Sequence, residues 1–165
     1  MRQPQVLVYE ADGRIAAQLR EAAKGRKDRK QPHWALHEPR QPEACLGLLR
    51  AGGRGVLVLK LGAVPQRDAS LLEQGVGEEA AVAERALLRG LTLLERVAWL
   101  CPEAATVVVA DADHAPLAAL CWDLGAAYVL APPQPRDWLP EIVAGLLGQP
   151  GGRPDRPPSL PTTDA

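Results

Sequence analysis

The sequence lacks the features that identify several common protein classes. No apolar stretch among its 165 residues approaches the roughly eighteen that a membrane-spanning helix needs. The start, MRQPQVLVYE, has neither the basic region nor the long apolar middle of a secretion signal. There is no GxGxxG after a strand, no Walker loop and no GxSxG elbow. We therefore expect a cytoplasmic protein outside the dinucleotide, nucleoside-triphosphate and hydrolase classes.

An excess of basic charge is also lacking. The formal net charge is -1, so nothing general offsets the charge of phosphate or anionic lipid, and we expect neither nucleic acid nor membrane as partner. One local exception is KGRKDRK (24–30), with five basic residues and one acidic residue. A solvated loop is the simpler interpretation, and contact with an acidic partner or a nucleic-acid backbone is the alternative.

Cysteine and histidine are few and scattered. The three cysteines, which show no CxxC spacing, are Cys45, Cys101 and Cys121. The three histidines, which form no HxxxH or HxH pair, are His33, His37 and His114. These patterns predict buried free thiols and exposed or loop histidines, with no metal site and no cofactor.

Strand and helix signals alternate along the chain. Short apolar runs predict strands at 5–10, 34–38, 55–62, 106–110 and 127–131. Helical spacing and capping residues predict helices at 13–25, 41–53, 78–104, 114–125 and 136–148. Continuously apolar strands are expected where helices cover both faces of a parallel sheet, so the prediction is a doubly wound α/β fold. The predicted domain spans residues 1–148 and is followed by a disordered tail rich in proline and glycine at 149–165.

In such sheets, ligands gather at the carboxyl ends of the strands. The residues at those ends are Tyr9, Glu10 and Asp12 after the first strand, Lys60 after the third, Ala110 and Asp111 after the fourth, and Ala131 and Pro132 after the fifth. They form the candidate site.

The predicted helix at 78–104 is apolar on more than one side. The residues spaced to share the sheet-facing side are Leu87, Leu91, Leu94, Ala98 and Cys101. Further apolar residues expected elsewhere around the helix are Leu88, Leu93, Val97 and Leu100. One-sided burial does not require this second set, so we expect a second contact, with either the long segment 63–78 or another subunit.

The chain resembles the CheY-like receiver domains of bacterial response regulators from about residue 4 to residue 147. QVLVYEADGRIAAQL resembles their first strand, acidic turn and first helix, and PEACLGLLRAGGRGVLVLKLG their second helix and central strand. TVVVADAD and LAALCWDLGAAYVLAPP resemble the fourth strand through the fifth with its closing proline. The resemblance implies a receiver-like (flavodoxin-like) three-layer sandwich and a signalling module rather than an enzyme.

The family's chemistry does not carry over with the fold. Receivers hold Mg²⁺ with an acidic pair after the first strand and use an aspartate after the third as phosphoacceptor. A Ser/Thr after the fourth strand and a Lys before the closing proline complete their site. The matching residues here are Tyr9 and Glu10 for the pair, Lys60 for the acceptor, Ala110 for the Ser/Thr, and Ala131 before Pro132 for the Lys. Only Glu10, with Asp12 nearby, keeps any of this site.

Lys60 poses the central question of the sequence. Phosphoryl transfer needs an oxygen nucleophile and a divalent cation, and a lysine supplies neither. Our hypothesis is that the ammonium lies within reach of Glu10, Asp12 or Asp111 and takes the metal's place, which leaves the domain permanently unswitched. The alternative is that Lys60 extends to solvent.

We therefore predict a degenerate, stand-alone pseudo-receiver that binds proteins independently of phosphorylation. Its partner would be a sensor kinase or another signalling protein, and a homodimer is also open. The candidate partner-binding residues are Trp122, Tyr128 and Trp138. Two alternatives remain: a conventional phosphoacceptor using a displaced carboxylate such as Asp12 or Asp111, and a small-ligand sensor or enzyme using the crevice around Lys60.

Overall fold

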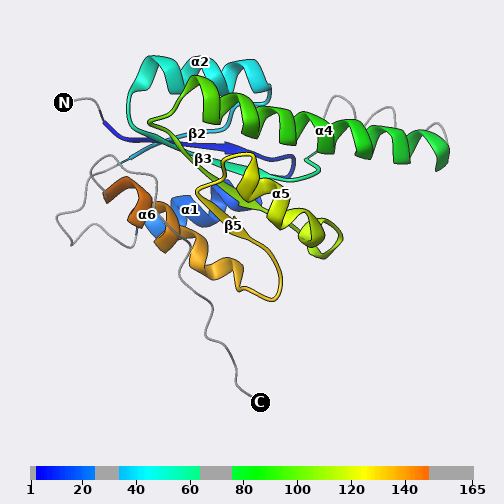
Figure 1. Ribbon diagram of the computed structural model, residues 1–165. Helices are drawn as coiled ribbons and strands as arrows, with labels where there is room; N and C mark the ends of the chain where they lie inside the picture. Colours follow the sequence, from blue (N-terminus) through cyan, green and yellow to red (C-terminus); the bar gives the residue numbers. More distant parts are fainter. Residues whose placement is uncertain (1–2, 25–33, 64–75, 149–165) are drawn as a thin grey trace.

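The computed structural model describes residues 3–24, 34–63 and 76–148 (Figure 1). Three predictions fall partly or wholly outside these ranges. They concern the basic segment after Lys24, most of the segment 63–78, and the tail from Gln149. His33 also lies outside the described residues.

Five parallel strands form one sheet, in the order β2-β1-β3-β4-β5. The strands are β1 (Gln5–Tyr9), β2 (Ala35–His37), β3 (Gly55–Lys60), β4 (Ala105–Val109) and β5 (Tyr128–Leu130). The α-helices are α1 (Arg14–Lys24), α2 (Pro42–Gly52), α4 (Val76–Leu100), α5 (Ala118–Asp123) and α6 (Leu139–Gly148). Two 3₁₀ helices, η2 (Ala112–Leu117) and η3 (Arg136–Trp138), precede α5 and α6. The predicted doubly wound parallel α/β fold is confirmed.

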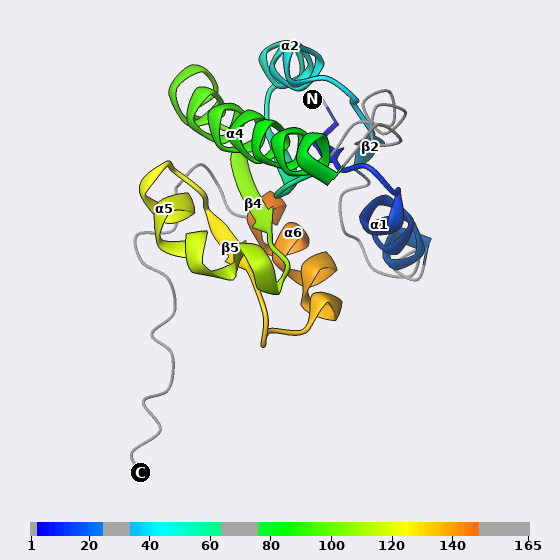
Figure 2. The same ribbon diagram turned by 90° about the vertical axis from the view of Figure 1, so that its right-hand side faces the viewer.

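Helices cover both faces of the sheet. Figure 1 shows α2 and α4 on one side of the strands and α1 and α6 on the other, and Figure 2 shows that α5 lies on the side of α2 and α4. The side chains of β3 alternate accordingly: Leu57 and Leu59 pack in the core beneath α2, α4 and α5, and Val56 and Val58 in the core beneath α1 and α6. Covered faces explain why the strands are apolar at every position.

The long helix departs from its prediction in how it is buried. Leu94 and Cys101 are buried as expected, but Leu93 and Val97 are buried too, although they were expected on another side. Leu88 and Leu100 are exposed. The buried apolar stripe of α4 is therefore rotated about the helix axis relative to the predicted stripe. As a result, Leu87, Leu91 and Ala98 are only partly buried. The N-terminal turns of α4 project past the neighbouring elements (Figure 1).

Two predicted helices each divide into a 3₁₀ turn and an α-helix. Pro116 lies inside η2, where its missing N–H interrupts the backbone bonding of the predicted helix 114–125. Pro140 is the second residue of α6, a first-turn position that tolerates proline. The helix predicted at 136–148 accordingly begins as η3 and becomes α-helical at Leu139.

The cysteine prediction is confirmed, because all three thiols are free and buried. Burial raises the pKa of Cys45 to about 12. The histidine prediction is wrong for His37, which is half-buried within β2 rather than in a loop. In the ranges that the structure describes, no helix is both long and apolar enough to cross a membrane.

Candidate functional site at the carboxyl edge of the sheet

The register of the strands brings the predicted site residues to one edge. Lys60, the last residue of β3, is in register with Val109, the last residue of β4. The Leu61 N–H donates to the Val109 carbonyl at 2.9 Å, and the Ala110 N–H donates to the Leu130 carbonyl at 2.9 Å. The three strands thus end at one level, so the segments that follow them are neighbours.

The Lys60 ammonium forms an ion pair with Asp111, which follows β4. Its Nζ lies 2.5 Å from Asp111 Oδ2, and the Lys60 side chain is only 17% exposed. Asp111 Oδ1 is contacted in turn by the guanidinium of Arg136, at the start of η3. Lys60, with a smaller contribution from Arg136, lowers the pKa of the Asp111 carboxyl below its ordinary value. Two cations and one carboxylate therefore connect the segments after β3, β4 and β5.

Glu10 has a different role from the one that the resemblance implies. Its Oε2 accepts from the Ile15 N–H at 3.0 Å, and its Oε1 accepts from the Ala16 N–H at 2.9 Å. These N–H groups belong to the first turn of α1 and have no carbonyl partner within the helix. Partial burial raises the pKa of Glu10, although the two backbone hydrogen bonds oppose this effect. Glu10 therefore caps the helix.

Asp12 also has a local role. Its Oδ1 accepts from the Arg14 N–H at 3.2 Å, and its Oδ2 lies 3.4 Å from Arg14 Nε. Both side chains of this pair are largely exposed. Of the three carboxylates expected within reach of Lys60, the structure pairs Asp111 with it and gives Glu10 and Asp12 other partners.

The side chains do not fit the Mg²⁺ that the resemblance implies. Both oxygens of Glu10 are engaged by backbone N–H groups, and the Lys60 ammonium adds positive charge at the same edge. A hard divalent cation needs several free oxygen ligands. Within the described part of the chain, no three His, Cys, Asp or Glu side chains gather as a metal would require.

Arg136 is a residue of this cluster that was not predicted from the sequence. The predicted site residues directly follow the strands, whereas Arg136 lies beyond the loop that follows β5. The structure returns it to the edge, where its backbone carbonyl also accepts from Gln18 Nε2 of α1 at 2.9 Å. The only signal in the sequence was a cation that begins the last predicted helix.

His114 of η2 packs against the segment that follows β3. A Cβ added to Gly62 would lie 2.6 Å from His114 Cε1, and Gly62 has a φ of +72°. Glycine is favoured here both by the backbone conformation and by the close ring. The half-buried position of His114 differs from the exposed or loop position predicted for it.

The remaining candidates divide between core and surface. Tyr9 and Ala110 are buried in the core, whereas Ala131 is half-buried and Pro132 is exposed. Among the candidate partner-binding residues, Trp122 of α5 and Tyr128 of β5 form an edge-to-face pair with ring centroids 6.1 Å apart. Trp138 of η3 is 49% exposed. The structure therefore joins the first two and places the third on a separate element.

Comparison with known protein families found no matching family model, and no curated protein matches the sequence. Solved structures do match. A signal receiver domain from Vibrio parahaemolyticus, from a protein described as a LuxO repressor, is 16% identical with a TM-score of 0.60. The match covers 88% of this chain and 90% of that one.

Two further structures show the same likeness. The N-terminal receiver domain of a two-component response regulator from Bacteroides fragilis is 13% identical, with a TM-score of 0.60, and the match covers 90% of this chain and 99% of that one. A Burkholderia pseudomallei response regulator, solved with a phosphorylated aspartic acid, a calcium ion and citrate, is 16% identical with a TM-score of 0.52. That match covers 88% of this chain and 66% of the other. This protein therefore has the CheY-like receiver fold of the response regulators.

Proposed function

We propose that the protein is a pseudo-receiver, a signalling module that binds a protein partner without being phosphorylated and has no enzymatic activity of its own. Its partner is a sensor kinase or another protein of bacterial signal transduction. The receiver fold supports the signalling role, and the chemistry of the carboxyl edge supports its independence from phosphorylation.

The Lys60–Asp111 ion pair is the observation that carries this proposal. Lys60 ends the central strand, where the resemblance places the acceptor aspartate, and its ammonium lies 2.5 Å from the carboxylate. An ammonium at this place supplies a fixed positive charge where a receiver would bind a regulated one, and it repels a divalent cation. The positive charge at this edge of the sheet is therefore permanent rather than regulated.

The displaced-carboxylate alternative receives no support from the geometry. Asp111 is held by Lys60 and Arg136, and Asp12 is bound to Arg14. Ion pairing to two cations lowers the nucleophilicity of Asp111. A ligand site around Lys60 likewise has no specific observation in its favour, since the ammonium is engaged by a side chain of the protein itself.

A thermal-shift titration tests the proposal. The full chain is melted with Mg²⁺ alone, with beryllofluoride alone and with both, and tryptophan fluorescence gives a second signal. Beryllofluoride with Mg²⁺ mimics a phosphorylated aspartate. The Burkholderia pseudomallei regulator, solved with a phosphorylated aspartic acid, is the positive control.

The expected result is no change in melting temperature in any condition for this chain, together with a clear rise for the control. A saturable stabilisation that needs both Mg²⁺ and beryllofluoride would show a working acidic site and overturn the proposal. The Asp111→Asn and Asp12→Asn variants would then identify the carboxylate responsible.

A further inference from the structure

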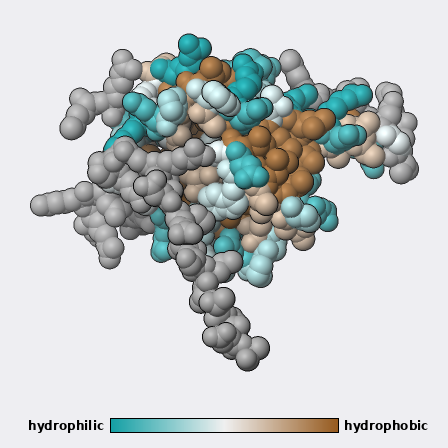
Figure 3. All heavy atoms as spheres, in the orientation of Figure 1, coloured by the Kyte–Doolittle hydropathy of each residue, from teal (hydrophilic) through white to brown (hydrophobic). Residues whose placement is uncertain are grey.

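An apolar surface lies between α4 and α5, on the face shown in Figure 3. The view shows a continuous hydrophobic area below α4. Leu88 of α4 is 56% exposed and Leu120 of α5 is 41% exposed. Leu87 and Leu91 of α4 are only partly buried and connect this surface to the core. Exposed apolar areas of this kind mark interaction sites when they are contiguous.

The rim of this surface on α4 is acidic. Glu84, Leu88, Leu91 and Glu95 are spaced by four, three and four residues, so they share one side of the helix. The arginines of α4 follow a neighbouring row that turns toward α2. Arg96 of that row pairs with Glu43 of α2 at 3.7 Å.

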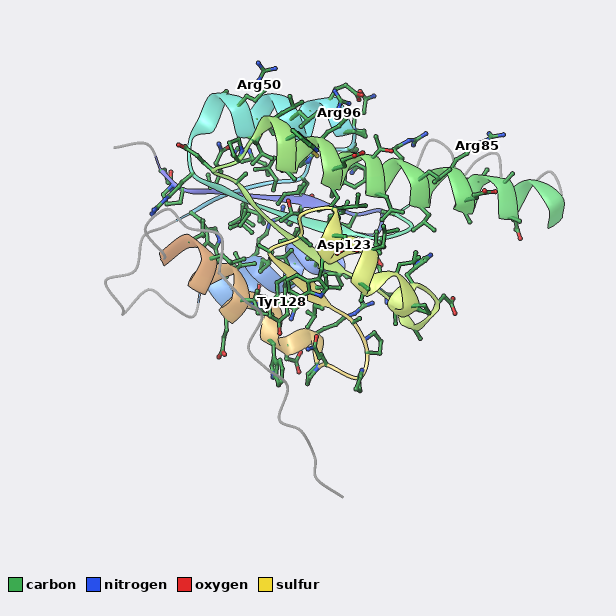
Figure 4. All side chains as sticks on the ribbon, viewed as in Figure 1. Arg50, Arg85, Arg96, Asp123 and Tyr128 are labelled. Atoms are coloured by element: carbon green, nitrogen blue, oxygen red, sulfur yellow. The ribbon has the colours of Figure 1, made fainter. Side chains whose placement is uncertain are left out.

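Figure 4 makes this separation of charge visible. Arg85 and Arg96 extend from the upper side of α4, away from α5, whereas Asp123 lies on the face that carries the apolar area. Glu84, Glu95 and Asp123 are all exposed. Arg85 and Arg96 therefore point away from the acidic rim.

The α5 side of the surface is acidic as well. The sequence contains no lysine or arginine between Arg96 and Arg136, a stretch that includes η2, α5 and β5. Its exposed charges near α5 are Asp113 and Asp123. Leucines bordered by carboxylates on two helices therefore define one surface, the α4–α5 face, made of Glu84, Leu88, Glu95, Leu120 and Asp123.

We propose that the α4–α5 face binds a basic amphipathic helix of a partner protein. Leucines of such a helix, at i, i+3, i+4 and i+7, would cover Leu88 and Leu120, and its lysines or arginines would meet the carboxylates of the rim. This inference rests on the proposed function, because it assigns the surface through which the module meets its partner.

The charge of the rim argues against three other occupants, namely a second copy of the chain, anionic lipid and nucleic acid. In a symmetric dimer through this face, the same carboxylates would meet across a two-fold axis and repel each other. Anionic lipid and nucleic acid would be repelled for the same reason. A basic amphipathic helix can make favourable contacts with both the apolar centre and the acidic rim of the face.

A designed peptide tests the proposal. The probe is a fluorescently labelled helix of about 18 residues with leucine at i, i+3, i+4 and i+7 and lysine elsewhere, and the control peptide carries glutamate at every lysine position. Fluorescence anisotropy with the full chain should give saturable binding of the lysine peptide, with an affinity that falls as salt rises. The glutamate peptide should bind at least about tenfold more weakly.

Variants of the face provide the specificity test. Leu120→Ser and Asp123→Lys should each weaken binding of the lysine peptide by roughly three- to tenfold. Their matched controls are Leu100→Ser and Glu141→Lys, which should leave binding unchanged. Leu100 is 49% exposed but follows Arg96 by one helical turn on the α2 side, and Glu141 is exposed on α6. Far-ultraviolet circular dichroism confirms that each variant is folded.

Several results would overturn the assignment of this surface. They are an absence of saturable binding up to about 1 mM peptide, equal binding of the two peptides, and equal weakening by the face variants and their controls. Sedimentation showing self-association that Leu120→Ser abolishes would also overturn it, because a second copy would then cover the face.

Repeating the titration with Mg²⁺ and beryllofluoride separates this inference from the proposed function. Binding that needs both additives and is weakened by the face variants would keep the α4–α5 face as the docking surface but end the claim of independence from phosphorylation. If the peptide does not bind in any condition and the melting temperature does not change, the α4–α5 face is not the docking surface. The proposed function would still hold in that case.

Discussion

At the scale of the residue, Lys60 combines an apolar stem with a charge that needs a partner. The stem is largely buried at the end of β3, and the ammonium reaches Asp111, which is itself half exposed. Such a partly buried pair keeps more of its attraction than an exposed one, because water screens it less. Lys60 is therefore expected to contribute to stability as well as to fix the charge of this edge.

Replacing Lys60 by methionine should destabilise the fold by about 1–2 kcal/mol, because Asp111 loses its main partner while the apolar stem is kept. Urea denaturation measures the free energy of unfolding. The matched control is Lys24→Met, which breaks the exposed Lys24–Glu21 pair and should cost about 0.5 kcal/mol or less. Equal losses in the two variants would show that Lys60 behaves as an ordinary surface lysine.

The ion pair also predicts a dependence on pH. Because the folded-state pKa of Asp111 lies below its ordinary value of 3.8, its contribution to stability is present above pH 3.8 and is lost as the pH falls through the lowered pKa. The difference in unfolding free energy between wild type and Asp111→Asn should therefore shrink below about pH 4. In a Lys60→Met background this pH dependence should be much weaker. A difference that stays constant down to pH 2 would contradict the prediction.

At the scale of the element, one side chain within β1 and one directly after it determine how two helices join the sheet. Glu10 caps the N-terminus of α1 with both carboxylate oxygens. Gln5 of β1 is buried and donates from Nε2 to the Leu48 carbonyl of α2 at 3.1 Å. Its amide occupies the space beside Gly52, where an added Cβ would lie 1.1 Å from Gln5 Nε2. Glycine at position 52 therefore leaves the space that the Gln5 amide occupies.

Alanine substitutions at two glycines of α2 should change the stability of the fold in opposite directions. Gly52→Ala should destabilise by roughly 1–3 kcal/mol, because it displaces a buried, hydrogen-bonded amide. Gly47→Ala, with nothing within 4 Å of the added Cβ, should stabilise by about 0.5–1 kcal/mol through helix propensity. Thermal unfolding of both variants gives the comparison.

A Gln5→Ala background provides the control for the Gly52 prediction. Removing the amide should relieve most of the cost of Gly52→Ala, so the two substitutions should be strongly non-additive. Additive effects would mean that the clash with Gln5 is not the cause.

At the scale of the whole molecule, the ionic cluster links segments that are far apart in sequence. Lys60, Asp111 and Arg136 join the segments after β3, β4 and β5, and the Gln18 bond to the Arg136 carbonyl adds α1. The segments at the carboxyl edge of a doubly wound sheet are loops and turns, which move more readily than the strands that they follow. A permanent cluster there is expected to hold those segments in one arrangement.

Hydrogen exchange can measure this coupling. In Lys60→Met, the amides of η2 and η3 should exchange faster, by up to about tenfold, because the cluster that restrains both turns is broken. The amides of α2, which lie outside the cluster, should be unchanged. Faster exchange spread evenly over the sheet and helices would instead indicate a global loss of stability.

The sequence was sufficient for the fold because its signals are local. Within the described ranges, apolar runs mark each strand, and helical spacing marks each helix to within a few residues. Turn residues separate them, and the parallel arrangement follows from strands that are apolar on both faces. The rotation of the α4 stripe could not be predicted, because Leu93, Leu94, Val97 and Leu100 allow more than one apolar side and only packing on the sheet selects among them.

The site was predictable only in part, because local signals identify the residues at the strand ends but not the partners of their side chains. By itself, the sequence determined that Lys60 ends the central strand and that, apart from Glu10, the side chains expected of a receiver site are replaced. Only the tertiary structure decided that Asp111, rather than Glu10 or Asp12, receives the ammonium, that Glu10 caps α1, and that Arg136 joins the cluster. The physical reason is that partner choice depends on strand register and loop path, which bring together residues 51 and 25 positions apart in the chain.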